Sequence, residues 1–231
     1  MLELLLAAFA FVGTHLVLAG TPLRGMLVAK VGEGAYLIGY AIISLVTISW
    51  LSDAYKVAPY VETWGQLYVL QPVALVLMFL AFFLVVVGLT TPSPTLVGAE
   101  GLLDRENPVT GILRITRHPF LSGVTLWGLT HLIVNGDQAG LILFGSLVVL
   151  CVIGAYSIDA KRREKLGDKW SDFAAQTSVL PFGAIIQGRN WLSVVELGWW
   201  RILLAVLGFG AMLHFHGQLF GVSPIGAMMG G

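Results

Sequence analysis

The stretch RITRHPFLSGVTLWGLTHLIVNG, residues 114–136, decides the fold because it joins an apolar run to several ionisable side chains. Most of it is apolar enough for a membrane-spanning helix, yet it opens with Arg114, Arg117 and His118 and carries His131 much deeper. A bilayer tolerates such groups only at its edge or facing the interior of a bundle, where they usually have a function. The stretch therefore predicts a spanning helix and a buried polar site.

The whole chain has the composition of an integral membrane protein. Of its 231 residues, 57% are hydrophobic and 11% are charged, and the mean hydropathy is +0.85. Soluble domains carry about 25% charged residues. Basic and acidic residues number 13 each, so the net charge indicates no particular partner, and no nucleic acid is expected. The single cysteine, Cys151, cannot form an internal disulfide, and the sequence has no C-x-x-C-H motif for covalent haem attachment.

Six segments are long and apolar enough to span a bilayer, which takes about 17–25 residues. The first segment lacks the basic start and the small-residue cleavage site of a signal peptide, so we expect it to be a transmembrane helix rather than a cleaved signal. The fourth and fifth are joined by the turn NGDQAG, which predicts an antiparallel hairpin. The expected fold class is therefore all-α, a single integral membrane domain over residues 1–231 formed by a polytopic bundle of about six transmembrane helices. The segments are 2–19, 35–51, 70–90, 119–135, 140–157 and 199–220.

Lysine and arginine are confined to alternate loops. All of the 13 basic residues except Lys56 lie in or beside the first, third and fifth loops between the six segments. Because cytoplasmic loops carry the excess of Lys and Arg, both termini are expected outside. The fifth loop contains GDKWSDFAAQTSVLPF, residues 167–182, in which Trp170 and Phe173 share one helical face. This predicts a short interfacial amphipathic helix that ends near Pro181.

The histidines lie at different expected depths in the bilayer. At 1.5 Å per residue, His15 is about 9 Å from the cytoplasmic boundary and His131 is on the order of 18–20 Å from it. By the same measure His214 and His216 lie at about 22–25 Å, near the outer boundary. His118 is expected at the cytoplasmic edge, where it can anchor the interface or bind lipid phosphate together with the neighbouring arginines.

Two interpretations are open for the buried histidines. They can form helix-to-helix hydrogen bonds, or they can bind haem iron or another metal as neutral imidazoles. There is no H-x-x-H motif and there are few intramembrane carboxylates, so a dinuclear carboxylate site is not expected. Two histidines from separate helices of an apolar bundle fit haem b best. Trp127 lies four residues before His131 on the same face and can pack against a porphyrin, although such spacing is also typical of ordinary packing.

Three motifs resemble the NnrU family of bacterial membrane proteins. They are GTHLVLAGTPLR at 13–24, RHP…H…NGD at 117–137 and KWSDFAAQTSVLPFGAIIQGR at 169–189. The resemblance covers nearly the whole chain and extends more distantly to plant and cyanobacterial cis-zeta-carotene isomerases. It implies a bacterial inner membrane protein associated with nitrite and nitric oxide reduction, with respiratory reductase subunits as partners.

The isomerase branch binds haem b between two histidines and, after reduction of the iron, isomerises a carotenoid double bond. Matched by motif, the resemblance implies iron ligands at His15 and His131, with His118 in support. The roughly 10 Å difference in their depths requires tilted helices or a tilted haem, and His214, closer in depth to His131, is the expected replacement for His15. Besides membrane lipid, a hydrophobic small molecule or a gaseous ligand is the implied partner. The expected cofactor-binding set is His15, Arg24, Arg117, His118, Trp127, His131 and His214.

A second resemblance supplies an alternative. RHPFLSG followed by EKLGDKWSDFAAQTSVLPF is similar to membrane methyltransferases of the isoprenylcysteine carboxyl type. It implies a pocket for S-adenosylmethionine in which Arg117 and His118 grip the cofactor. The chain departs from that pattern where an acidic pair is required, since Asp159 is followed by Ala160, and this makes methyl transfer the less favoured activity. A third interpretation is a non-enzymatic partner or assembly factor for respiratory reductases.

Overall fold

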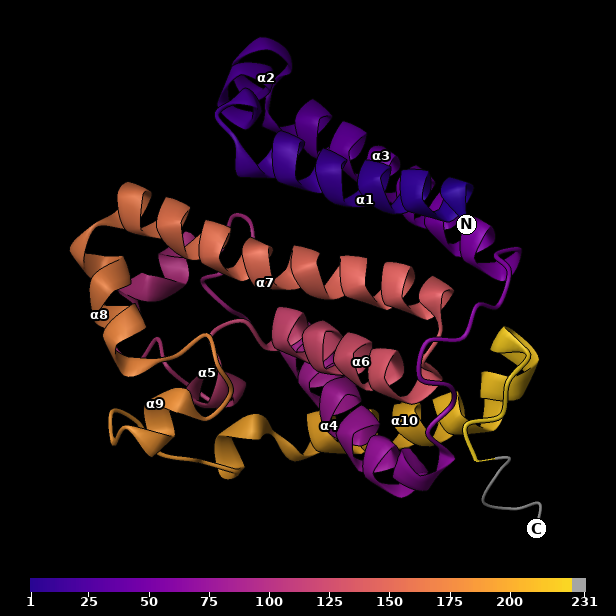
Figure 1. The fold of residues 1–231 in the computed structure, drawn as a ribbon. Coiled ribbons are helices and arrows are strands. Elements are labelled where there is room, and N and C mark those ends of the chain that lie inside the picture. The colour runs from indigo at the N-terminus through magenta and orange to yellow at the C-terminus, as the bar shows by residue number, and fades with distance from the viewer. Residues whose placement is uncertain (226–231) are drawn as a thin grey trace.

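The computed structural model describes residues 1–225 as a bundle of helices (Figure 1). Each of the six predicted segments forms one long helix, so the all-α membrane bundle is confirmed. Five of these helices are long and apolar enough to cross a membrane. The remaining one, α6, has 17 residues, which is the lower end of the spanning range of about 17–25. The long helices are α1 (Leu2–Gly20), α3 (Glu33–Lys56), α4 (Gln71–Thr90), α6 (Pro119–Asn135), α7 (Gln138–Leu166) and α10 (Trp199–Phe220).

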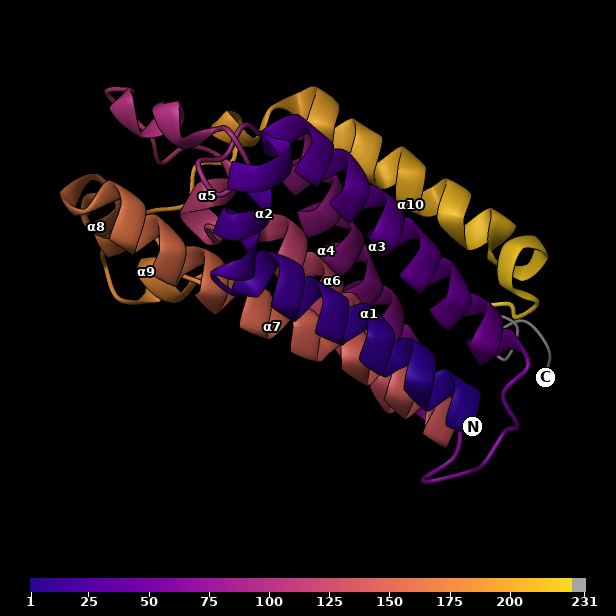
Figure 2. The same cartoon turned by 90° about the horizontal axis from the view of Figure 1, so that it is seen from above.

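The short helices, except the single turn that precedes α4, gather at one end of the bundle, opposite the N-terminus and the end of α10 (Figures 1 and 2). We call this the basic end, because the first, third and fifth loops meet there. Lys161 at the end of α7 donates to the carbonyl oxygen of Ala19, and Arg162 and Lys165 both pair with Glu100. The clustering of basic loops at one end agrees with the alternation in the sequence. The short elements are α2 (Leu23–Val31), η1 (Tyr68–Leu70), η2 (Glu100–Asp104), α5 (Ile112–Ile115), α8 (Asp168–Gln176), α9 (Gly183–Ile186) and η3 (Val195–Leu197).

Helix α7 is central to the packing. It packs against α1 on one side and α6 on the other, while α3 completes a layer with α1 and α10 packs against α4 (Figure 1). A buried apolar cluster, which includes Leu4, Phe11, Leu51 and Phe144, joins α1, α3 and α7. Such a shared core fixes α1 and α3 on α7, although sequence alone indicates only that all three are apolar.

The hairpin between α6 and α7 is confirmed. Helix α6 ends at Gly136, which adopts the left-handed conformation with φ 58° that glycine accommodates at a helix C-terminus. Asp137 then caps α7, because its carboxylate accepts a hydrogen bond of 2.8 Å from the backbone N–H of Gly140. The turn NGDQAG therefore supplies the end of one helix and the cap of the next.

The predicted amphipathic helix forms as α8, but two details of the prediction are wrong. It ends at Gln176 rather than near Pro181. Its apolar side chains Trp170 and Phe173 are fully buried against the protein, in a cluster that includes Ile112 and Leu113, and do not lie on lipid. The reason is that the chain after α8 pairs with the residues before α6, which turns the apolar face of α8 inward.

Helices α4 and α6 approach closely at Gly123. A Cβ atom there would lie 2.7 Å from the carbonyl oxygen of Ala81 and 2.9 Å from the backbone nitrogen of Val85. Small residues allow this kind of contact between membrane helices. At Gly145 in α7, by contrast, the nearest atom to an added Cβ is a side-chain carbon of Leu132 at 3.8 Å.

We expect Gly123→Ala to destabilise the protein, because backbone atoms cannot move aside as a side chain can. The cost of such overpacking is about 1–3 kcal/mol. Thermal unfolding of the purified protein in mild detergent measures it, with Gly145→Ala as the matched control. Equal unfolding midpoints for the two variants would show that α4 and α6 are not in close contact at this position.

Candidate functional site

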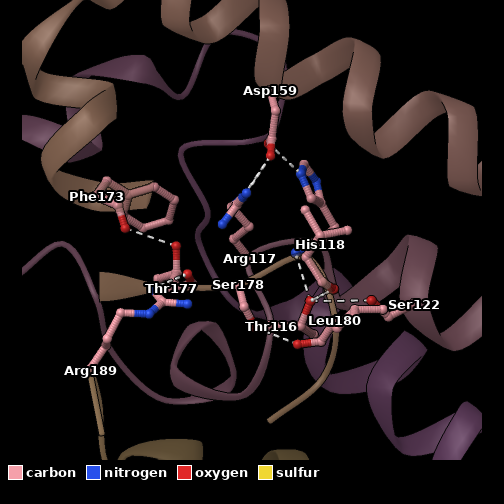
Figure 3. A network of polar contacts seen from close by, with 11 residues as sticks. Thr116, Arg117, His118, Ser122, Asp159, Phe173, Thr177, Ser178, Leu180 and Arg189 are labelled. Carbon is pink, nitrogen blue, oxygen red and sulfur yellow. Dashed lines mark hydrogen bonds and ion pairs between the residues drawn. The ribbon is translucent and has the colours of Figure 1, made fainter. Parts of the chain in front are cut away.

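A short non-helical segment between α8 and α9, residues 178–182, fixes the start of α6, and we call it the strap. The backbone N–H of Arg117 donates to the carbonyl oxygen of Ser178 at 2.9 Å, and the backbone N–H of Phe182 donates to that of Ile115 at 2.8 Å. The hydroxyl of Thr116 donates to the carbonyl oxygen of Val179 at 2.8 Å. These bonds hold the residues before α6 against the strap at the basic end (Figure 3).

Arg117 and His118 share one carboxylate, that of Asp159 in α7 (Figure 3). Arg117 donates to Oδ2 through Nε at 2.8 Å and through Nη2 at 2.5 Å. His118 contacts Oδ1 through Nε2 at 2.7 Å, and its side chain is 2% exposed. These contacts hold the start of α6 on α7. Because Asp159 already engages both side chains, neither Arg117 nor His118 is free to bind a cofactor through the same nitrogen atoms. Sequence reasoning noted Asp159 only as a departure from the methyltransferase pattern, although a carboxylate in an apolar helix is itself a signal.

Arg114 is also satisfied within the protein. Its guanidinium donates to both carboxylate oxygens of Glu196, at 2.7 Å and 2.9 Å, and to the side-chain oxygen of Asn190 at 2.9 Å. It lies over the ring of Trp191, 4.0 Å from the centroid. The expectation that Arg114 anchors the membrane interface or binds lipid phosphate is therefore replaced by an internal ion pair.

We expect Glu196→Gln to destabilise the protein by about 3 kcal/mol at neutral pH, because it leaves the buried Arg114 without its carboxylate. The hydrogen bonds from Arg114 lower the pKa of Glu196. A carboxyl group with a lowered pKa stabilises the fold above its unfolded-state pKa, and the contribution is lost as the pH falls through the folded-state pKa. Wild-type unfolding midpoints should therefore decrease on acidification below about pH 4.3, and those of Glu196→Gln should decrease less.

Thermal unfolding in detergent at several pH values measures this difference. Glu106→Gln is the control, because Glu106 is exposed in the same part of the structure and forms none of the ion pairs found among residues 1–225. The same acid dependence in Glu196→Gln as in the wild type would contradict the assignment of this ion pair.

Two partly buried histidines have one ring nitrogen held by their own helix. Nδ1 of His15 lies 2.7 Å from the carbonyl oxygen of Phe11, and Nδ1 of His131 lies 3.0 Å from that of Trp127. A carbonyl oxygen only accepts hydrogen bonds, so Nδ1 carries the proton in each ring and Nε2 carries the lone pair. Histidines that bind metals almost always donate their other N–H in this way. The chemistry of His15 and His131 therefore fits haem iron.

The other three histidines differ from this pair. Nε2 of His118 is engaged by Asp159. His214 is exposed on α10, and no hydrogen bond to its ring is found among residues 1–225. His216 has Nδ1 held at 2.6 Å by the carbonyl oxygen of Val222, so α10 offers His216 rather than His214 as a possible ligand. The sequence analysis selected His214 from its expected depth. Depth does not reveal whether a ring nitrogen is held by a hydrogen bond to the backbone.

The rings of His15 and His131 border the same apolar core but do not touch each other. The His131 ring stacks on Phe144, with centroids 4.7 Å apart and planes 21° apart, and Trp127 also contacts it, at 4.7 Å, as the four-residue spacing predicts. His15 contacts Phe11 at 4.4 Å and the edge of Tyr40 at 5.4 Å.

Arg24 lies at the basic end, where it pairs with Glu33 at 2.5 Å and lies over the ring of Tyr36. Among residues 1–225 there is no cluster of three or more His, Cys, Asp or Glu side chains that could hold a metal ion. Haem requires only axial ligands from the protein, since the porphyrin supplies the other four.

Comparison with known proteins agrees with the resemblance in the sequence. The chain is similar to the chloroplastic 15-cis-zeta-carotene isomerase of Zea mays, 36% identical over 81 residues, and to that of Arabidopsis thaliana, 35% identical over 81 residues. In both cases the match covers 35% of this chain and 22% of the relative, so it spans less than a quarter of those proteins. No solved structure matches the chain. A family model described as NnrU protein matches residues 3–224, and the chain therefore belongs to the NnrU family.

Proposed function

We propose that this NnrU protein is a haem b-dependent membrane isomerase that changes the geometry of a double bond in a polyene, and that His15 and His131 would hold the haem iron. The observation that carries the proposal is that each of these rings has Nδ1 held by a carbonyl oxygen of its own helix, which leaves Nε2 to bind iron. The similarity to proteins named 15-cis-zeta-carotene isomerase supports a carotenoid-like substrate.

A bound haem would supply redox-active iron, which the largely aromatic side chains around these histidines cannot provide. The chain itself would orient the ligands and exclude water. Phe144 and Trp127 restrict the ring of His131, and Phe11 and Tyr40 restrict that of His15. An apolar interior of this kind also suits a hydrocarbon substrate, which has no polar group to be recognised.

The positions of the two ligands along their helices differ. His15 lies about 8 Å from the basic end of α1, and His131 lies about 18 Å from the basic end of α6. Since α7 lies between α1 and α6 (Figure 1), ligation of one haem by both histidines would require these helices to rearrange around α7. If α1 does not supply the second ligand, His216 on α10 is the replacement, because its Nδ1 is also held by a carbonyl oxygen.

A direct assay tests the proposed activity. The full chain is purified in detergent with haem, reduced with dithionite and incubated in the dark with 15-cis-zeta-carotene, and the geometric isomers are separated by chromatography. We expect loss of the 15-cis isomer with the reduced wild-type protein and none with His131→Ala, while His214→Ala remains active. Haem-loaded, reduced protein that leaves the substrate unchanged would refute the isomerase function.

A further inference from the structure

An apolar groove of about 430 Å³ lies between α4, α6, α7 and the strap. This volume is within the usual range of small-molecule sites, about 300–1,000 Å³. The two hydroxyl groups on its α6 wall are already bonded inside the protein: Thr125 donates to the carbonyl oxygen of Leu121, and Ser122 bonds with Thr116. Apart from the hydroxyl of Tyr156 on α7, the wall of the groove thus suits a hydrocarbon.

The groove runs along α6 from the basic end. Its α6 wall extends from Leu121 to Leu129, which is about 12 Å along the helix axis. Leu121 is in the first turn of α6, which begins at Pro119, so one end of the groove lies at the membrane surface. A groove with this direction and length fits one extended chain, aligned as lipid chains are.

A second recess, which contains two arginines, adjoins the groove on the other side of the strap. Val179 and Leu180 line both the groove and the recess. The recess also contains Arg117, Ser178 and Arg189, and it has no acidic residue in its wall. The strap thus separates the apolar groove from the recess that holds Arg117 and Arg189; Figure 3 shows these two arginines beside Ser178 and Leu180 of the strap.

The strap is held in an unusual conformation. Phe182 has φ 63°, the one positive value found for a residue other than glycine in the described part of the chain. Such a backbone costs about 1–3 kcal/mol and persists only where the surroundings impose it. Here the hydrogen bond from Phe182 to Ile115 imposes it, and the Phe182 ring forms part of the groove wall.

Arg189 gives the recess its positive charge. Its guanidinium donates to the carbonyl oxygens of Ala175 and Thr177 and to the side chain of Gln187. Within residues 1–225 it forms no ion pair with a carboxylate, whereas Asp159 balances the charge of Arg117. The recess therefore has a net positive charge and attracts a carboxylate or phosphate group.

We propose that the groove and the recess form one binding site for a single-chain amphiphile with an anionic head group. Its hydrocarbon chain lies in the groove along α6, and its head group lies at the membrane surface against Arg189. This site is separate from the proposed haem ligands, because neither His15 nor His131 lines the groove or the recess. The proposal therefore stands whether or not the protein binds haem.

Photoaffinity labelling of the full chain in phosphatidylcholine nanodiscs tests the chain position. The probe is a palmitic acid that carries a diazirine in its chain, and mass spectrometry locates the labelled peptides. We expect label on the groove segments of α6 and α7. Val152→Trp fills the groove from α7 and should reduce the label to background. Val149→Trp is the matched control, because it lies on the same helix with similar exposure (48% against 42%) and does not line the groove.

A second pair of variants tests the head group. Losing one charge-assisted hydrogen bond of about 1.5 kcal/mol corresponds to about ten-fold weaker binding, so Arg189→Gln should require about ten-fold more probe for equal labelling. Arg189→Lys should retain binding, and Arg105→Gln, which changes an exposed arginine outside the recess, should behave as the wild type. Size-exclusion profiles verify that each variant is folded.

Three results would overturn the proposal. Equal labelling by the acid and by the corresponding fatty alcohol would show that the head group is not recognised, as would an unchanged affinity in Arg189→Gln. Equal labelling of Val152→Trp and Val149→Trp would show that the chain lies elsewhere. If the probe labels the protein in detergent but only at background level in phosphatidylcholine nanodiscs, an ordinary two-chain lipid occupies the groove.

Discussion

Replacement of His131 by alanine is expected to yield a folded protein without haem. The variant removes a ring whose Nδ1 is held by the Trp127 carbonyl oxygen and whose face is stacked on Phe144. Loss of a group that hydrogen-bonds to a metal ligand weakens metal binding roughly 10–100-fold. Loss of the ligand itself should weaken haem binding by more than this. The haem content per protein, measured as the pyridine haemochrome after purification, gives the result.

Four further variants complete this experiment. His131→Met should retain haem with an altered spectrum, because methionine is also an axial ligand of haem iron. His214→Ala should retain full haem content, since no hydrogen bond to its ring is found in the described residues. His15→Ala should lose haem, whereas loss in His216→Ala instead would move the second ligand from α1 to α10. Undiminished haem in His131→Ala would exclude the proposed site.

Asp159→Ala is expected to be the most destabilising substitution at the basic end. It leaves Arg117 and His118, whose side chains are 11% and 2% exposed, without their shared carboxylate. Removing one partner of a buried ion pair costs about 3–5 kcal/mol, because the remaining charge stays buried and unpaired. Hydrogen exchange should also increase at the backbone N–H of Arg117, which the strap holds. Unfolding in detergent measures the loss of stability.

Asp53→Ala is the control for this prediction. Asp53 pairs with Lys56 on the surface at 2.9 Å, and exposed pairs of this kind contribute about 0–1 kcal/mol. If Asp159→Ala unfolds at the same temperature as Asp53→Ala, the Arg117–His118–Asp159 group does not hold α6 on α7.

The sequence predicts the long helices well because an apolar run of spanning length has few other stable conformations in a membrane. The ends are predicted less well. Helix α7 continues to Leu166, beyond the predicted limit of 157, because the lysines, arginines and glutamate that follow are good helix formers outside the lipid. The amphipathic pattern of α8 predicts a helix, but it does not distinguish lipid from protein as the partner of its apolar face.

The polar contacts of the candidate site could not be predicted from local patterns. Arg117 and His118 are adjacent in sequence, but their partner Asp159 is in another helix. Arg114 likewise pairs with Glu196, which lies beyond α6, α7, α8 and α9 in the sequence. Motif resemblance identified His15 and His131, yet only their positions in folded helices show which ring nitrogen is protonated. Pairing across helices depends on how those helices dock, and this is a property of the whole bundle.

The absorption spectrum of the full chain, purified from haem-replete cells and recorded before and after addition of dithionite, tests whether iron is bound between two imidazoles. The proposed ligation predicts a Soret band that shifts on reduction, together with the sharp α and β bands of a six-coordinate b-type haem. A folded protein that is colourless, and that remains so after incubation with haem, would contradict it.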